Sequence, residues 1–135
     1  MIKKILLFAT LVIVLSACQS YNKEIKEVIS NADSVAINYF KGDGTTDTVV
    51  DVRIIRDKNS MDQLVNFIAA QEAQPKESCG YDGSIHFFKQ DSVVQDIRFR
   101  MNADSCMYFT FKQDGKTVAT VLSTEAKQLL ESFRK

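Results

Sequence analysis

The sequence predicts an α+β fold in which an antiparallel sheet of about six strands carries two helices packed on one face, with a further short N-terminal helix. Two observations predict it. Short runs such as SVAINYF and CMYFTFK alternate apolar and polar residues with the period of a half-buried strand. Two other segments place apolar residues three and four positions apart, which is the spacing of one face of an α-helix.

The first elements expected are a short helix and a β-hairpin. A helix over about residues 22–31 is indicated by apolar residues at helical spacing, namely Ile25, Val28, Ile29 and Ala32. The alternating runs SVAINYF and TVVDVRIIR follow it. Between them, Lys41-Gly42-Asp43-Gly44 has the residues of a tight turn, so we expect the two runs to pair.

A longer helix is expected to begin at Ser60. The Ser60 hydroxyl can cap the helix while the side chain of Gln63, three residues later, reaches back to the cap. The apolar stripe of this helix consists of Met61, Leu64, Val65 and Ile68. A loop with the only proline of the chain, QEAQPKESCGYDG, comes next.

The remaining chain predicts further strands and a C-terminal helix. The strand runs are SIHFFK, VVQDIRFRM, CMYFTFK and TVATVL. In the second of them the residues expected to face inward are Ile97, Phe99 and Met101, and those expected outward are Asp96, Arg98 and Arg100. Phe-Lys-x-Asp recurs at three expected strand ends and indicates a repeated hairpin turn. The last helix is expected to start near Ser123 or Thr124, with a stripe of Ala126, Leu129, Leu130 and Phe133.

The N-terminus has the composition of an export signal. Two lysines precede the run from Ile5 to Leu15, whose only polar member is Thr10, and the small residues Ser16 and Ala17 follow. As a helix this run would rise only about 16 Å, against roughly 30 Å for a bilayer core. We therefore expect a cleaved leader rather than a membrane span.

Leu15-Ser16-Ala17-Cys18 resembles the lipobox of bacterial lipoprotein signal peptides, whose cysteine is acylated and becomes the first residue of the mature chain. The resemblance implies a signal peptide over residues 1–17 and lipidation, including palmitate, at Cys18. Each buried methylene contributes about 0.8 kcal/mol, so several acyl chains anchor a protein permanently. Residues 18–33 are then the lipid anchor, a tether and the short helix, and residues 34–135 are a single α+β domain.

The same resemblance implies a location. In such lipoproteins an aspartate after the cysteine tends to retain the protein in the inner membrane, and this chain has Gln19 there. The expected location is therefore the outer membrane, facing the periplasm. Residues 19–23 lack the acidic stretch that some bacteria use for surface export, so cell-surface display is the less favoured alternative.

The charge balance excludes some partners. Without the leader, which removes Lys3 and Lys4, the chain has a net charge of about −2. A near-neutral chain of mixed charges offers no electrostatic case for binding nucleic acid. We therefore expect the protein to contact the membrane only through its lipid anchor.

Cysteine usage favours a structural disulfide. Cys79 and Cys106 are 27 residues apart, which matches neither a CxxC redox motif nor a zinc ribbon. In an oxidising periplasm they are free to pair, although two free thiols remain the alternative. A bridge of this loop length would stabilise the fold by roughly 3.5 kcal/mol.

The sequence contains little that indicates catalysis. The single histidine, His86, lies within an apolar strand run, where a structural role is expected. The oxygen-rich segment Asp43 to Asp47 lacks the spacing of a calcium loop, and no nucleotide-binding or hydrolase motif occurs. We expect no cofactor, no metal and no enzymatic activity.

The functional candidate is the loop Gly80, Tyr81, Asp82 and Gly83, which directly follows Cys79. It is either a disulfide-tethered turn or a recognition loop, because an exposed tyrosine held by a bridge loses little entropy on docking. The expected function is that of a lipid-anchored envelope binding or accessory protein with a protein partner.

Two alternatives remain. The first is an inhibitor of an envelope hydrolase, such as a lysozyme or a protease. This chain is similar in size, anchoring and disulfide use to small lipoproteins that inhibit lysozyme, but it lacks their Ser-Gly-x-x-Tyr element. The second is a carrier of a small apolar ligand between the sheet and the helices, which would require a sizeable apolar cavity.

Overall fold

The computed structural model describes residues 21–41, 47–74 and 79–135, whose strands form one antiparallel sheet. Seven strands lie in the order β2-β1-β4-β5-β6-β7-β3. Their bounds are β1 (Ser34–Phe40), β2 (Val49–Ile55), β3 (Glu72–Ala73), β4 (Gly83–Lys89), β5 (Ser92–Arg100), β6 (Tyr108–Gln113) and β7 (Lys116–Val121). The α+β class is confirmed. The additional strand is β3, whose two residues are too few to show an alternating pattern.

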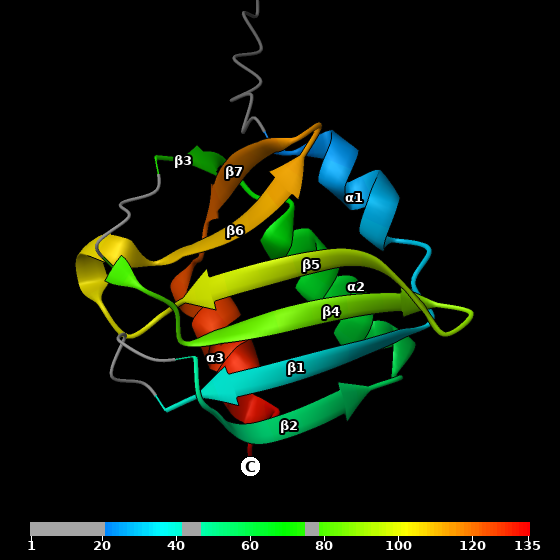
Figure 1. The fold of residues 1–135 in the computed structure, drawn as a ribbon, viewed down its shortest axis with the longest axis horizontal. Helices are drawn as coiled ribbons and strands as arrows, with labels where there is room; N and C mark the ends of the chain where they lie inside the picture. The colour runs from blue at the N-terminus through cyan, green and yellow to red at the C-terminus, as the bar shows by residue number, and fades with distance from the viewer. Residues whose placement is uncertain (1–20, 42–46, 75–78) are drawn as a thin grey trace, which may run out of the picture.

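Helices α2 (Lys58–Ile68) and α3 (Thr124–Ser132) cover one face of the sheet, as Figure 1 shows. The stripe predicted for α2 is buried, as are Ala126 and Leu130 of α3, while Leu129 and Phe133 pack at the margin of the core. The short helix α1 (Lys23–Ile29) buries Ile25 and Ile29 in the same core, so it lies against the domain. Among the described residues, no helix is long and apolar enough to cross a membrane.

The core lies between the helices and the inward side of the sheet. The inward residues predicted for β5, Ile97 and Phe99, are at most 1% exposed, and Met101 just beyond the strand is also buried. Aromatic rings fill the centre, and Tyr39 meets Phe99 edge-on with ring centroids 6.0 Å apart. Burial alternates residue by residue along β1 and the second half of β5, as the sequence predicted, whereas four successive residues of β6 are buried and β2 contributes little to the core.

The start of α2 differs from the prediction. The helix begins at Lys58, and Asp57 is its cap, accepting hydrogen bonds from the Ser60 backbone N–H at 2.9 Å and the Ser60 hydroxyl at 2.7 Å. These bonds lower the pKa of the Asp57 carboxyl. Ser60 is thus a residue of the first turn rather than the cap. Asp57 Oδ2 accepts both bonds, as the side-chain oxygen of a helix N-cap residue can. In α3 the predicted cap, Ser123, is confirmed.

Two of the three Phe-Lys-x-Asp motifs lead into hairpin turns of the same geometry. Gln90 and Asp91 join β4 to β5 with positive φ angles of 50° and 65°. Asp114 and Gly115 join β6 to β7 with φ angles of 53° and 77°. Two successive positive φ angles define the type I′ turn, whose twist matches that of paired strands. The third motif continues beyond Lys41 into residues 42–46, outside the described part of the chain.

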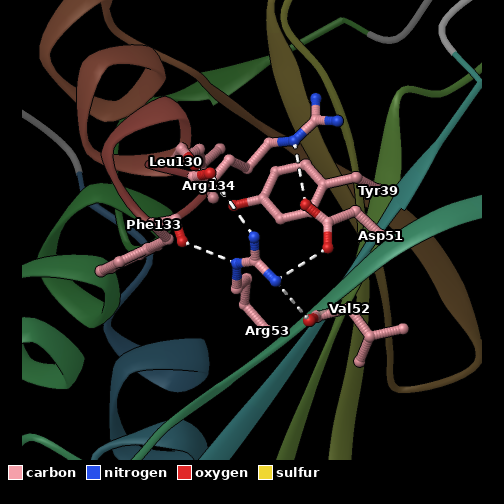
Figure 2. Close-up of polar contacts among 7 residues, drawn as sticks. All are labelled: Tyr39, Asp51, Val52, Arg53, Leu130, Phe133 and Arg134. Carbon is pink, nitrogen blue, oxygen red and sulfur yellow. Dashed lines mark hydrogen bonds and ion pairs between the residues drawn. The ribbon is translucent and has the colours of Figure 1, made fainter.

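The end of α3 is fastened to the first hairpin by the contacts in Figure 2. The Tyr39 hydroxyl donates to the Leu130 carbonyl at 2.5 Å, and Arg53 donates to the Phe133 carbonyl at 3.0 Å. Asp51 in turn pairs with Arg53 at 2.9 Å and with Arg134 at 3.5 Å. Cations at a helix C-terminus satisfy its last carbonyls and its dipole. Asp51 and Arg53, which alternate with valines in β2, therefore lie on the helix-covered side.

Candidate functional site

The side of the sheet away from α2 and α3 carries a row of polar side chains. Strand pairing places Asn38 beside Ser84, Ser84 beside Arg98, and Arg98 beside Thr110. The next row places His86 beside Asp96. We call the outward surface of β1, β4, β5 and β6 that these residues occupy the polar face. It faces the viewer in Figure 1, and the described helices do not cover it.

A hydrogen-bond network occupies the centre of the polar face. The Asn38 amide nitrogen lies 3.2 Å from His86 Nε2, and the Ser84 hydroxyl lies 3.1 Å from the same atom. His86 Nδ1 lies 2.5 Å from Asp96 Oδ1. Because the Asn38 amide can only donate, Nε2 acts as an acceptor, and His86 carries its proton on Nδ1, facing Asp96. His86 is thus fixed by partners on three strands.

The order Ser84, His86, Asp96 matches the sequence of contacts in a hydrolase triad, but its surroundings do not match. An acyl-transfer site needs an accessible nucleophile and donors directed at the developing oxyanion. Ser84 is only 8% exposed and lies in mid-strand, where β4 is paired on both sides and its backbone N–H groups belong to the sheet ladder. The arrangement therefore fits a structural network better than a nucleophilic centre.

Beside this network lies a groove of about 460 Å³ across β5, β6 and β7. We call it the Arg98 groove. Its lining residues are Tyr81, Asp96, Arg98, Thr110, Phe111, Lys112 and Thr117. The volume lies within the range of small-ligand pockets. Two cations, one carboxylate, two threonine hydroxyl groups and two aromatic residues thus lie around one depression of the polar face.

The cations of the groove are available to a ligand. The Arg98 side chain is 55% exposed, and its ion pair with Asp47 is long at 3.8 Å. Lys112 donates to the Thr117 hydroxyl at 2.7 Å, which holds the ammonium over the groove and leaves it further donors. Thr110 Oγ1 is buried and has no hydrogen-bond partner among the described residues. A polar atom of this kind is normally satisfied, so its hydroxyl is a donor that a ligand could use.

The predicted recognition loop reaches this groove through one residue. Tyr81 lines the groove, and the Arg98 guanidinium lies over its ring, 5.1 Å from the ring centroid. The sequence predicted an exposed tyrosine. The side chain is half-buried, because Arg98 of the neighbouring strand covers one of its faces.

Asp82 and Gly83 have structural roles. Asp82 is 2% exposed, pairs with Arg100 at 2.8 Å and accepts the backbone N–H groups of Met101 at 2.7 Å and Asn102 at 3.0 Å. A Cβ atom on Gly83 would overlap the Asn38 carbonyl and the Phe99 ring. Gly80 has a φ angle of 64°, in the left-handed region that favours glycine. The loop is therefore a rigid turn that presents Tyr81.

The two cysteines predicted to pair lie at disulfide distance, with Cα atoms 6.1 Å apart. Cys106 lies in a short 3₁₀ turn, η2 (Asp104–Cys106), rather than in β6 as the sequence suggested. The pair packs with Tyr108 and Ala119 in a small apolar cluster apart from the main core. The cysteine pair thus places Cys79, two residues before Tyr81, against the outward side of the sheet.

Cys18, the predicted lipidation site, and the signal peptide lie outside the described residues. Within the described part of the chain, no group of three or more His, Cys, Asp or Glu side chains is placed to hold a metal ion. No protein-family model, curated protein or solved structure matches this chain.

The sequence singled out Tyr81 but not the groove around it. Arg98 and Asp96 were expected to point outward, and they do. Thr110, Lys112 and Thr117 gave no signal, because alternation assigns them to the outward side without showing which residues lie opposite each other. The strand register brings them together, since Thr110 pairs with Arg98 and Lys112 pairs with Thr117.

Proposed function

We propose that this protein is a lipid-anchored cell-envelope protein that acts by binding a partner at the Arg98 groove, without catalysis. The observation that carries the proposal is the groove itself, in which two cations and the unpartnered hydroxyl of Thr110 surround one depression. Donors in this arrangement suit an acidic group, such as a carboxylate on a partner protein. The anchor at Cys18 would hold this surface at the outer membrane, facing the periplasm.

Rigidity of the groove supports a binding role. Tyr81 is held by the turn at Gly80, by the buried Asp82 that follows it, and by the neighbouring cysteine pair. A surface that is ordered before binding loses less conformational entropy when the partner docks. Tyrosine and arginine are also the residues that most often dominate binding energy in protein interfaces.

The test is recovery of partners from the native host with a tagged copy, after chemical crosslinking of the membrane fraction. The variant Arg98→Glu reverses the charge of the groove. Lys58→Glu is the matched control, because it makes the same kind of change on α2 and breaks only an exposed ion pair with Asp62. We expect wild type and Lys58→Glu to recover the same envelope protein and Arg98→Glu to lose it. Equal recovery by all three would contradict the proposal.

The inhibitor alternative is favoured by one observation, the rigid presentation of Tyr81 next to a cation. It predicts that Tyr81→Ala abolishes binding to the hydrolase while the melting temperature changes little. Unchanged affinity would exclude the loop as the inhibitory element. The carrier alternative has less support, since the pocket between α1, α2 and β4 has a volume of only about 270 Å³.

A further inference from the structure

One edge of the sheet is unprotected. Strand β2 pairs with β1 on one side only, and its other side is the end of the described sheet, as Figure 1 shows. Edge strands present free N–H and C=O groups, and proteins commonly shorten such strands or place charges on them. The opposite edge follows this rule, because β3 has only two residues. Strand β2 has seven residues without proline or lysine; its two charged residues, Asp51 and Arg53, lie on the helix-covered side, and its register irregularity is near its start.

The outward side of this edge strand is also apolar. Val50, Val52 and Ile54 are 55%, 49% and 51% exposed. They alternate with Asp51 and Arg53, which turn toward α3. Exposed apolar side chains scattered singly are ordinary, but three in register on a free edge form a continuous stripe. The stripe and the free edge together suit pairing with another strand.

The free backbone groups of β2 fall on the residues of this stripe. The Phe40 N–H donates to the Asp82 carbonyl, on the β4 side of β1. Because backbone groups alternate in direction along a strand, Ile37 directs its groups toward β2, where Arg53 is its partner. Val52 and Ile54 then direct theirs outward. The register irregularity falls on Val50, because Tyr39 pairs with Asp51 and Phe40 pairs with Val49, whereas Asp51–Ile55 are regular.

We infer that β2 pairs with β2 of a second copy of this chain, antiparallel and centred on Val52. In this register each residue lies opposite the one equally far on the other side of Val52. Val50 therefore lies opposite Ile54, and Asp51 lies opposite Arg53, with opposite charges across the pair. Shifting the centre to Arg53 would place two Arg53 side chains opposite each other, which is unfavourable. The strand is thus self-complementary in one register.

The pairing extends the sheet across the two-fold axis and covers the apolar stripe with its own copy. A single pair of seven-residue strands buries less surface than a standard stable interface of roughly 1,600 Å². The dimer is therefore reversible, and its detection requires covalent trapping. The Arg98 groove lies on β5, β6 and β7, away from this edge, so pairing leaves the groove open.

The test is disulfide trapping of the full chain in native membranes. Val52→Cys places two cysteines face to face on the two-fold axis, whereas Val93→Cys introduces a cysteine at a valine of equal exposure, 50%, on β5. Under mild oxidation we expect Val52→Cys to yield a covalent dimer on a non-reducing gel and Val93→Cys to yield none above background. Differently tagged Val50→Cys and Ile54→Cys chains, when co-expressed, should crosslink to each other, which checks the register.

Other results would overturn the inference. If Val52→Cys forms no more dimer than Val93→Cys, the second copy does not pair there. If Val52→Cys is trapped instead with another protein, or with a cysteine elsewhere in the same chain, a different strand occupies the edge. Neither outcome depends on the Arg98 groove, so the binding proposal is tested separately by the Arg98→Glu variant.

Discussion

At the scale of single residues, buried polar groups explain why the turn before β4 is rigid. Asp82 is the clearest case, since its carboxylate has a cation and two backbone donors as partners. Such a group contributes through the cost of leaving its partners unpaired rather than through its own attraction alone. The sequence marked Asp82 as part of a recognition loop because it follows Tyr81 and the predicted bridge at Cys79, and a one-dimensional pattern carries no information on burial.

Removing the Asp82 carboxylate should be strongly destabilising. We expect Asp82→Ala to lower the free energy of unfolding by about 3–5 kcal/mol, because Arg100 and two N–H groups lose their partner. Urea unfolding measures this. Asp47→Ala is the control, since Asp47 is exposed and makes only a long ion pair, and it should change stability by about 0.5 kcal/mol or less. Equal effects of the two variants would refute the assignment.

Tyr39 should make stability depend on pH in the alkaline range. Burial raises the pKa of Tyr39 to about 12; Arg134 lowers it, and Asp51 raises it further. The unfolded chain loses this proton near pH 10, while the folded chain keeps it. The contribution to stability is therefore present below about pH 10 and is lost as pH rises toward 12, in total about 2–3 kcal/mol.

The Tyr39→Phe variant tests this pH dependence. It should be less stable than wild type at pH 7, because the hydrogen bond to the Leu130 carbonyl is lost, and its stability should fall less between pH 10 and 12. Denaturant unfolding at several pH values gives both quantities. Tyr21→Phe, at an exposed tyrosine, is the control. Parallel alkaline profiles of wild type and Tyr39→Phe would contradict the burial argument.

At the scale of elements, the spacing of apolar residues predicted most helices and strands. It failed where a segment has no regular spacing of apolar residues. The stripes of α2 and α3 and the alternation of β1, β5 and β6 were readable because one side of each faces the core. The start of α2 was misplaced because its first apolar position is Met61, so the pattern says nothing about the preceding turn. In β2 the pattern showed a strand but not which of its sides faces the core, and the apolar side faces outward in the structure.

The cysteine pair should stabilise the fold and the presentation of Tyr81 together. Replacing both Cys79 and Cys106 with serine should lower the free energy of unfolding by roughly 3.5 kcal/mol through the greater freedom of the unfolded chain. Denaturant unfolding measures this difference. Wild-type protein treated with reductant should show the same loss and a shift in gel mobility, whereas the double variant should be insensitive to reductant. If reductant changes neither stability nor mobility of wild type, the bridge does not form.

At the scale of the whole molecule, the described domain has one sheet face that its helices leave open. The helices occupy the other face, so a partner that approaches from solvent meets the polar face first. The sequence could not predict the hydrogen-bond network at the centre of this face, because β1 and β4 are neighbours in the sheet although β2, α2 and β3 separate them in the chain. Non-local pairing of this kind is invisible to local patterns.

The anchor itself has a direct test. Cys18→Ala removes the acylation site, and we expect the protein to move from the membrane pellet to the soluble fraction on cell fractionation. Cys18→Ala leaves the Cys79 and Cys106 pair intact, so the domain should keep its melting temperature. Retention of the variant in the pellet would show that membrane attachment does not depend on the lipid.

The most direct test of the central claim is site-specific photo-crosslinking in the native host from Thr117, at the lining of the Arg98 groove. A photoreactive side chain at Lys127 of α3, on the helix-covered side, is the matched control. The account predicts one discrete adduct with an envelope protein from position 117, absent from position 127 and lost when Arg98→Glu is added. Adducts of equal yield from both positions, or none from position 117, would contradict it.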